Sequence, residues 1–494
     1  MGIKPSTRGE GLHPVRGATT IQQLISSSVF GVGLPWLVAT LLLPVGLTFI
    51  VYWPYLNDFF VDDDFMFLQQ VHNHGALDAF VRAFTSPHAT EFEAPTPLWR
   101  PATDVLIQTQ HALWGLRPGP YHAMSFTMHG LIGGLGGVLV SKLSRSAVAG
   151  LVTASVFVVF PSYDVAVTWI SDQTELFPAL LSMVSLVAFY GFLMAEEQRS
   201  AKWALAGSIV ALQIAMLGKE SQAVSGILLA LLAFTVTNPR RTRREIAVAL
   251  AVAFVAVLPI GLFGYVQELR DPASSRLYGL GAHTWSNSWE HLGQLTFPFG
   301  SPGKDGPTEA RDAAAVVYLS LGIGAMLMRW RVPTFFFVWS LIALAVFGPI
   351  RFPPFARYTY LATLPFVAFC VTGARASWRR VLETERSRFA LALVGAAIVA
   401  FVVLGSALET RRRQAPLHRR AQDFEAVVAA TRIQCGELAR DIHVYVLGRD
   451  PADPFNVNMA AALNLFHERV YVGRGDPPAR AGRFCLVEVP PSSE

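Results

Sequence analysis

The sequence predicts an all-α polytopic membrane protein with about 11 transmembrane helices, followed by a small C-terminal α/β domain. Two observations support this fold class. Of the 494 residues, 52% are hydrophobic and only 15% are charged. Apolar runs of about 18 residues recur between Leu34 and Leu408, and each could cross a hydrocarbon core of about 30 Å at roughly 1.5 Å per residue. The composition excludes an ordinary cytosolic enzyme.

The apolar runs define the transmembrane segments in chain order. The expected spans are 34–55, 122–141, 146–162, 174–195, 203–218, 221–237, 246–266, 313–329, 333–350, 358–374 and 389–408. The first has full spanning length and is expected to be an uncleaved anchor. The net charge of +5 is a small excess that reflects loop orientation, so we expect no nucleic-acid partner.

Lys and Arg residues gather in alternate loops, which the positive-inside rule assigns to the cytoplasm. The remaining loops are expected outside: 56–121, 163–173, 218–220, 267–312 and 351–357. Five arginines follow the last span and five precede it, so local charge does not orient that helix. The preceding spans place the C-terminus outside. We expect a multi-pass protein of a bacterial inner or cell membrane.

Two domains are expected. Residues 1–408 form the transmembrane domain, in which the first outer loop, 56–121, carries helices along the membrane surface. Residues 409–494 form the small soluble domain, with helices at 416–440 and 455–466 and strands at 442–447, 470–472 and 484–489. Cys435 and Cys485 of this tail are either a disulfide in an oxidising compartment or two small buried residues.

Three consecutive carboxylates, Asp62, Asp63 and Asp64, lie a few residues beyond the outer end of the first span. Adjacent like charges near a low-dielectric surface raise one another's pKa, which suits a general base or a cation site. The structural alternative is a solvated acidic turn that caps the following helix.

Further polar residues fall on the same expected side of the membrane. They are Arg100, His122, Lys219, Glu220 and Arg357. An ionisable residue inside the membrane is energetically unfavourable, so its presence suggests a functional role. The alternatives are that Lys219 and Glu220 form a snorkelling pair and that Arg357 anchors a span at the headgroups. We expect His129, inside the second span, to bond a neighbouring helix.

At these residues the sequence resembles the GT-C superfamily of membrane glycosyltransferases, nearest to the branch of protein O-mannosyltransferases and TMTC-type enzymes. The resemblance covers about residues 40–370. It rests on the acids at 62–64, Arg100-Pro101, the 114–122 stretch, Lys219-Glu220, the Arg357-Tyr358-Thr359-Tyr360-Leu361 element and the second outer loop with Asp164. The chain departs from the family at Val165, where a Glu is frequent, and at Gln173, where an Arg is common. The tail lacks the tetratricopeptide pattern of TMTC-type enzymes.

The resemblance implies transfer of a monosaccharide from a polyprenyl phosphate to a hydroxyl of a protein, lipid or cell-envelope glycan, with inversion, on the outer face. A carboxylate would accept the hydroxyl proton. Asp63 is preferred with Asp64 as the second acid, although the pair Asp62/Asp63 stays open. Arg357 would stabilise the leaving phosphate.

The remaining site residues have weaker assignments. Lys219 and Tyr358 are expected near the donor phosphate, and Arg100, His122, Glu220 and Asp164 are expected to shape the site. We expect no firm cofactor, although the acids at 62–64 offer the oxygen ligands that Mg²⁺ or Mn²⁺ prefers. Two rival functions stay open: a transporter or flippase for a lipid-linked substrate, and a non-catalytic scaffold of the envelope.

Overall fold

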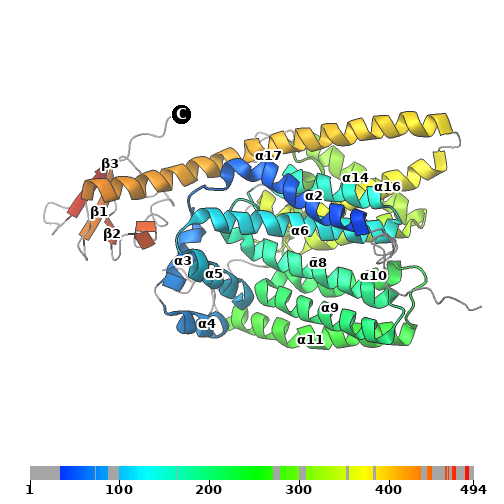
Figure 1. The fold of residues 1–494 in the computed structure, drawn as a ribbon, viewed down its shortest axis with the longest axis horizontal. Helices are drawn as coiled ribbons and strands as arrows, with labels where there is room; N and C mark the ends of the chain where they lie inside the picture. Colours follow the sequence, from blue (N-terminus) through cyan, green and yellow to red (C-terminus); the bar gives the residue numbers. More distant parts are fainter. Residues whose placement is uncertain are drawn as a thin grey trace, which may run out of the picture.

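The computed structural model describes most of the chain after the N-terminal region. The described residues are 34–72, 74–86, 99–163, 165–270, 279–299, 308–351, 355–381, 385–435, 442–447, 462–463, 465–466, 470–473 and 484–488. The long helices run roughly side by side as a bundle, and α17 passes along one edge of it toward a group of strands (Figure 1).

The bundle is built from helices that follow the predicted order of spans. They are α2 (Leu34–Tyr52), α6 (Pro118–Ser144), α7 (Ala147–Val159), α8 (Gln173–Met194), α9 (Gln198–Gly218), α10 (Val224–Thr235), α11 (Arg243–Arg270), α14 (Thr308–Leu327), α15 (Arg331–Ala345), α16 (Tyr360–Val381) and α17 (Glu385–Cys435). The described residues also form four helices outside the predicted spans: α3 (Asp63–His72), α4 (Ala76–Thr85), α5 (Pro101–Trp114) and α13 (Ala282–Thr296).

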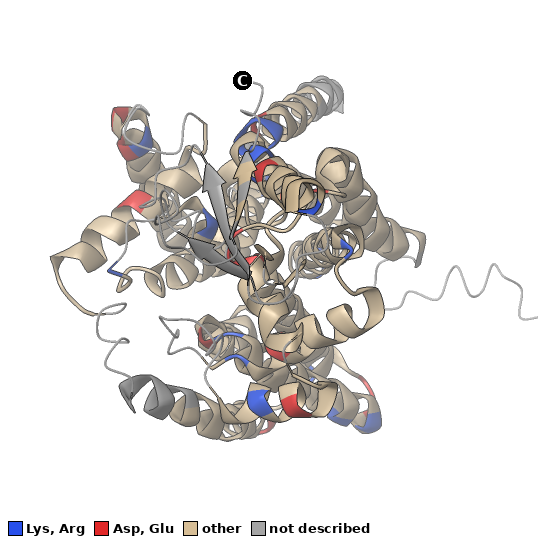
Figure 2. Cartoon of the chain, turned by 90° about the vertical axis from the view of Figure 1, so that its left-hand side faces the viewer, with Lys and Arg blue, Asp and Glu red and all other residues tan. Residues whose placement is uncertain are grey.

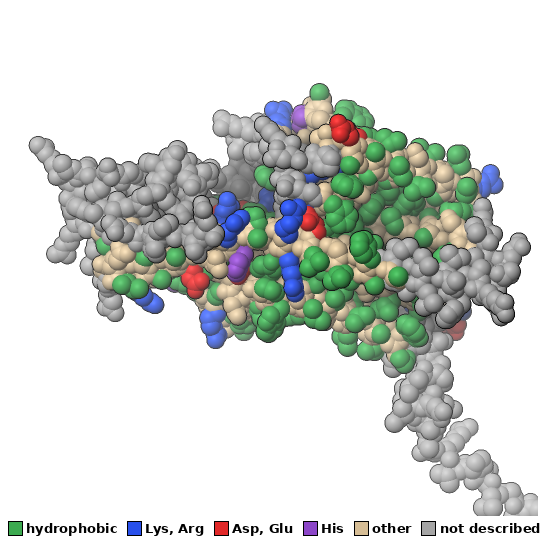
Figure 3. Space-filling view, turned by 90° about the horizontal axis from the view of Figure 1, so that it is seen from above, with side chains coloured by type: hydrophobic (Ala, Val, Ile, Leu, Met, Phe, Trp, Pro, Cys, Tyr) green, Lys and Arg blue, Asp and Glu red, His purple; other side chains and the backbone are tan. Residues whose placement is uncertain are grey.

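The helices confirm an all-α polytopic membrane protein. Among the described residues, seven helices are long and apolar enough to cross a membrane, and α7, α10 and α15 lie in three shorter apolar segments. Hydrophobic side chains cover much of the bundle surface, whereas many of the charged side chains in this view lie where the bundle meets the C-terminal region (Figure 3). The total of 11 spans stays a prediction.

Helices α2 and α6 approach each other closely because α6 presents glycines to α2. A Cβ atom added at Gly130 would lie 2.5 Å from the Cα atom of Val45, and one added at Gly134 would lie 3.0 Å from the Cα atom of Leu41. Small residues at this spacing let two membrane helices pack backbone against backbone.

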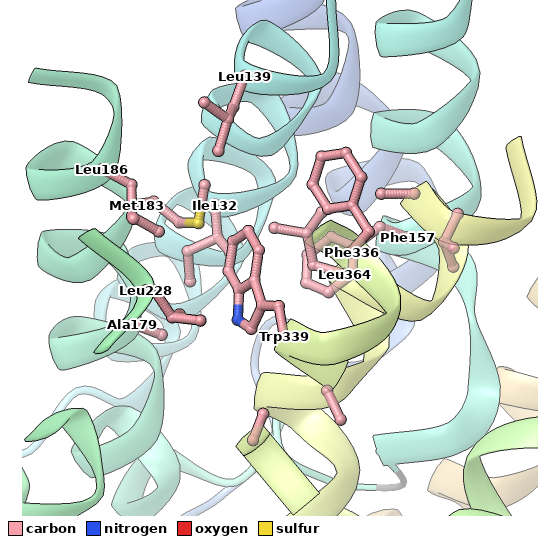
Figure 4. Packing of buried hydrophobic residues seen from close by; sticks show 14 of the residues in the cluster. Ile132, Leu139, Phe157, Ala179, Met183, Leu186, Leu228, Phe336, Trp339 and Leu364 are labelled. Atoms are coloured by element: carbon pink, nitrogen blue, oxygen red, sulfur yellow. The ribbon is translucent and has the colours of Figure 1, made fainter. Parts of the chain in front are cut away.

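The apolar core lies between several of these helices. Trp339 of α15 lies close to Ile132 of α6, with Met183 of α8 and Leu228 of α10 on the facing helices (Figure 4). The same residues, together with Leu364 of α16, line a small internal cavity. This core holds together the helices whose ends carry the candidate site.

Helix α17 differs from the sequence prediction. It contains 51 residues, or about 77 Å at 1.5 Å per residue, more than twice the thickness of a hydrocarbon core. The apolar pattern predicts a span that ends at 408 and a separate helix that begins at 416, but the structure has one continuous helix that contains Pro416. The helix thus runs through the predicted domain boundary, and the division of domains stays a prediction.

Three parallel strands follow α17: β1 (Ile442–Leu447), β2 (Val470–Gly473) and β3 (Phe484–Glu488), in the order β2-β1-β3. They match the predicted strands to within one residue. A disulfide joins Cys435, the last residue of α17, to Cys485 of β3, with their Cα atoms 5.9 Å apart. Of the two alternatives for these cysteines, the structure shows the bond.

Candidate active site

The predicted polar residues gather at one end of the bundle, the end from which α17 continues toward the strands. Figure 2 views the molecule from this side. A second apolar cluster lies here and includes Phe60, Phe65, Phe424 and Val487. Because Phe424 and Val487 belong to α17 and β3, the C-terminal segment packs directly on the loop that carries the three aspartates.

The three aspartates have different surroundings. Asp62 has a positive φ of 45°, a conformation that Asp tolerates better than most residues. Its Oδ2 atom lies 2.5 Å from Nη1 of Arg420 on α17. Asp63 begins α3 and is half-buried, and Asp64 follows it inside the protein.

Asp64 is held on both carboxylate oxygens. Its Oδ2 accepts a hydrogen bond from the backbone N–H of Val61 at 3.0 Å, and its Oδ1 accepts from the backbone N–H and the hydroxyl of Ser171 at 2.7 and 2.5 Å. Burial raises the pKa of Asp64 to about 8, against the lowering effect of these hydrogen bonds. Asp64 therefore ties the acidic loop to the 3-10 turn η4 (Ile170–Asp172).

The turn η4 brings the acidic loop and Arg357 together. Asp172, the last residue of η4, has its Oδ1 atom 3.7 Å from Nη1 of Arg357. Asp63 also interacts electrostatically with Arg357. Segments almost 300 positions apart in the chain are thus linked through η4.

Aromatic rings surround the Arg357 guanidinium. Its Cζ atom lies 4.7 Å from the ring centre of Trp169 and 5.4 Å from those of Phe355 and Tyr358. The Tyr358 ring stacks on Phe347 at 5.1 Å. Rings favour a cation that is partly removed from water. The Arg357 side chain remains 26% exposed, so a ligand can still reach it.

Two ion pairs flank this centre. Arg100 donates two hydrogen bonds to Glu220, from Nε to Oε2 at 3.2 Å and from Nη2 to Oε1 at 2.8 Å. Lys219 pairs with Glu175 of α8, and both side chains are nearly buried. Lys219 and Glu220 therefore do not form the pair with each other that one alternative proposed. Asp172 interacts electrostatically with Arg100 and Lys219, so these pairs and Arg357 share one electrostatic site.

The close packing of α8 and α9 sets the position of Lys219. Gly218 precedes it at the end of α9, and a Cβ atom there would lie 2.6 Å from Cγ of Pro178 on α8. The Gly218 carbonyl accepts a hydrogen bond from Thr103 of α5 at 3.0 Å. Glycine at this position lets three helices converge next to the ion pairs.

The histidines have supporting contacts. His122 Nε2 lies 3.0 Å from the Asp58 carbonyl oxygen and so supports the backbone that leads to the aspartates. His129 bonds to Tyr360 at 2.8 Å and to the Val158 carbonyl at 3.2 Å, which confirms its predicted structural role. Asp164 lies outside the described residues.

Gln173 stands where an Arg is common in the family that the sequence resembles, and its side chain is fully buried. It donates to the Tyr121 carbonyl and to Ser125 on α6 and accepts from Gln110 on α5. The position therefore joins helices behind the site through neutral hydrogen bonds.

Sequence reasoning missed Asp172 and Glu175. Both lie at the start of a predicted span, three residues apart, where an ionisable residue is unfavourable without a partner. That signal could have identified them, but the partners Arg357 and Lys219 are far away in the chain.

Among the described residues, no group of three or more His, Cys, Asp or Glu side chains could hold a metal ion. Asp62 and Asp64 were expected as possible ligands of Mg²⁺ or Mn²⁺. In the structure, Asp62 forms an ion pair with Arg420, and Asp64 accepts a hydrogen bond from Ser171.

Comparison with known proteins identifies relatives by structure alone. No family model matches the chain, and no curated protein matches its sequence. Among solved structures, ArnT from Cupriavidus metallidurans bound to undecaprenyl phosphate is similar with a TM-score of 0.52 and 14% identity, over 88% of this chain and 86% of ArnT.

The archaeal oligosaccharyltransferase AglB from Archaeoglobus fulgidus, in complex with an inhibitory peptide and a dolichol-phosphate, is similar with a TM-score of 0.51 and 11% identity. The match covers 88% of this chain and 64% of AglB. The TMTC-type branch is not specifically matched. The chain therefore has the same fold as these two membrane-bound enzymes' structures, and this likeness is one of fold alone.

Proposed function

We propose that this protein is a membrane glycosyltransferase that moves a monosaccharide from a polyprenyl phosphate to an acceptor hydroxyl on the outer face of the membrane. The observation that carries this proposal is the convergence of Asp63, Asp64 and Arg357 around η4. The shared fold supports it, because the similar ArnT and AglB structures contain undecaprenyl phosphate and a dolichol-phosphate.

The reaction follows from the charges at the site. The acceptor oxygen attacks the anomeric carbon and its proton passes to the Asp63 carboxylate, a general-base role. The bond from the anomeric carbon to the phosphate oxygen breaks, and its electron pair stays on the phosphate. Arg357 stabilises that charge by paired hydrogen bonds. One base and one leaving-group stabiliser support a single displacement with inversion.

The neighbouring groups would keep this arrangement in place. Asp64 positions Asp63 through its bonds to η4. Asp172 orients the Arg357 guanidinium from one side, and Tyr358 contacts it from another. Lys219 would add positive charge near the donor phosphate, although Glu175 already neutralises part of it. Divalent-cation dependence stays open in this proposal.

The rival function as a transporter is less well supported by the described residues. A secondary transporter places charged or unwound elements near the bilayer midplane. The buried ion pairs described here lie at helix ends, as Glu175 does at the start of α8 and Lys219 at the end of α9. Charges at one rim suit a reaction at the membrane surface.

The test is sugar transfer by membranes that contain the Asp63→Asn or Arg357→Gln variant, supplied with polyprenyl-phosphate monosaccharides. We expect each variant to lose transfer by about 100-fold or more, because a general base and an oxyanion stabiliser each contribute about that factor. Asp78→Asn is the matched control, since Asp78 is an exposed acid of α4 paired with Arg82. Full transfer by Asp63→Asn at normal expression would exclude its role as the base.

A further inference from the structure

The structure contains a second polar cavity at the end of the bundle opposite the candidate active site. It has a volume of about 540 Å³ and lies where α6, α8 and α10 end and α15 begins. A water molecule occupies about 30 Å³ of the liquid, so the cavity has room for a much larger group. The glycosyltransferase proposal uses none of its lining residues.

Three cations line this cavity. Lys142 is near the end of α6, Arg145 follows that helix, and Arg331 begins α15. The lining residues that the structure describes include no Asp or Glu. Positive charges without an acid among them, in a partly enclosed space, attract an anion more strongly than they would in open water.

The lining also supplies polar groups. The Ser141 hydroxyl is buried and has no hydrogen-bond partner among the residues that the structure describes. The charge of Arg145 acts on the Tyr190 hydroxyl, which lines the same cavity. A buried hydroxyl without a partner is costly, and Ser141 belongs to the lining of this cavity.

The backbone at Arg145 adds a second indication. Arg145 has φ 53° and ψ 46°, a left-handed conformation that Gly or Asn adopts more readily at a helix C-terminus. This chain has Arg at the position where Gly is usually preferred, and the long cationic side chain of Arg145 lines the cavity. Its carbonyl accepts a hydrogen bond from Arg375 of α16 at 3.4 Å, which keeps the turn in place.

The depth of the cavity in the membrane favours a lipid ligand. Trp36, at the start of α2, lines it and is 47% exposed. Tryptophan side chains on membrane helices prefer the level of the headgroups. The cavity therefore lies at the depth of the phosphates of the adjoining leaflet.

We propose that this cavity binds a phosphate group, supplied by the headgroup of an anionic phospholipid, through Arg145 and Arg331 with Lys142 and Ser141 alongside. Guanidinium groups form paired hydrogen bonds with phosphate oxygens. A free phosphate ion offers the same chemistry, so the test must separate the two sources. The positive-inside rule explains why basic residues lie on this side, but not why three of them face one cavity without an acid.

The test uses the full chain purified in an uncharged detergent and measures its affinity for dioleoyl phosphatidylglycerol, dioleoyl phosphatidylcholine and inorganic phosphate by native mass spectrometry. The variant is Arg145→Asn/Arg331→Gln, in which Asn suits the left-handed turn. The control is Arg199→Gln/Lys202→Gln, which removes two exposed cations from the neighbouring end of α9.

We expect the wild-type chain and the control to bind phosphatidylglycerol at least 10-fold more tightly than the Arg145→Asn/Arg331→Gln chain does. If inorganic phosphate bound tightly and the Arg145→Asn/Arg331→Gln chain lost that binding, the site would be supported but assigned to the free ion. The proposal would be overturned if the variant and the wild type bound phosphatidylglycerol and inorganic phosphate equally well. It would also be overturned if the control lost as much affinity for phosphatidylglycerol as the variant. If the double variant does not fold, Arg331→Glu alone must give the same loss.

Discussion

Residues 62–64 show how three identical side chains acquire separate tasks. Asp62 pairs with Arg420, Asp64 accepts hydrogen bonds from Ser171, and Asp63 interacts electrostatically with Arg357. Neighbours on a helix turn point in different directions. Two of the three acids are therefore held by partners on other elements, which suits the proposed role of Asp63 between them as the reactive group.

The buried carboxyl of Asp64 predicts a pH-dependent stability. Its pKa is about 8 in the folded protein, raised by burial from the usual value near 4. The folded state keeps this proton to a higher pH than the unfolded state does, so the free energy of unfolding falls as pH rises from about 4 to about 8. Asp64→Asn cannot ionise, and its melting temperature should therefore fall less between pH 5 and pH 8.

Thermal unfolding in detergent at several pH values measures this difference. The control is Asp78→Asn, because Asp78 is exposed and its partner Arg82 lowers its pKa. Its melting temperature should follow the wild-type dependence over the same pH range. Identical slopes for Asp64→Asn and the wild type would show that the Asp64 carboxyl does not titrate in that range.

The sequence located the charged side chains that gather at one end of the bundle, but not the pairs that they form. The acids at 62–64, Arg100, Lys219, Glu220 and Arg357 could be predicted because charged residues next to apolar spans are unfavourable without a purpose. Their partners could not, since the Arg100 to Glu220 pair joins residues 120 positions apart. Such contacts depend on how the helices pack, which the order of the spans does not determine.

At the scale of elements, glycine spacing on α6 predicts which helix contact is most sensitive. Gly130→Val should weaken the packing of α2 on α6, because its Cβ atom would lie 2.5 Å from the Val45 backbone. Overpacking of a core costs about 1–3 kcal/mol, and backbone cannot move aside as a side chain can. We expect a clearly lower melting temperature in detergent.

Gly207→Val is the matched control for that change. Gly207 lies on α9, and a Cβ atom added there meets nothing within 4 Å. The same substitution in a spanning helix should leave the melting temperature close to that of the wild type. Equal losses in both variants would point to the general effect of Val on a helix and not to the contact between α2 and α6.

Spans were easier to predict than their ends. Each predicted span falls on a helix because length and hydrophobicity are local properties of the chain. The sequence prediction began a separate helix at 416, whereas α17 continues through this stretch in the structure. In the structure, Arg411 donates to the carbonyls of Ile50 and Val51, and Arg412 and Arg413 pair with Glu409. These contacts let α17 continue beyond its apolar part.

At the scale of the whole molecule, α17 connects the C-terminal segment to the acidic loop. His418 Nδ1 lies 2.7 Å from Oδ1 of Asp58. Arg420 pairs with Asp62, which follows Asp58 by four residues in the acidic loop. Burial raises the pKa of Asp58 to about 6, and the nearby His418 opposes that rise. Arg420 and His418 thus connect α17 to the acidic loop at two points.

Arg420→Ala should therefore lower sugar transfer without removing it. The pair is partly exposed, and such pairs contribute about 0–1 kcal/mol, so we expect a loss of about 5-fold at most. Arg419→Ala is the control because Arg419 is the adjacent exposed arginine of α17. Transfer rates of membranes with matched expression give the comparison. A loss in both variants alike would indicate an effect of net charge on α17 and not of the contact with Asp62.

The disulfide between Cys435 and Cys485 tests the arrangement of the whole chain across the membrane. Such bonds persist in oxidising compartments, so its presence agrees with the expected outside location of the tail. In intact cells that carry Cys370→Ser, a membrane-impermeant maleimide should label the protein only after an impermeant reductant has opened the bond. The chain with only Cys370 is the control for leakage. Labelling before reduction would show that the bond is absent in the cell. Failure to label after reduction would contradict an outside location of the tail and of the candidate active site beside it.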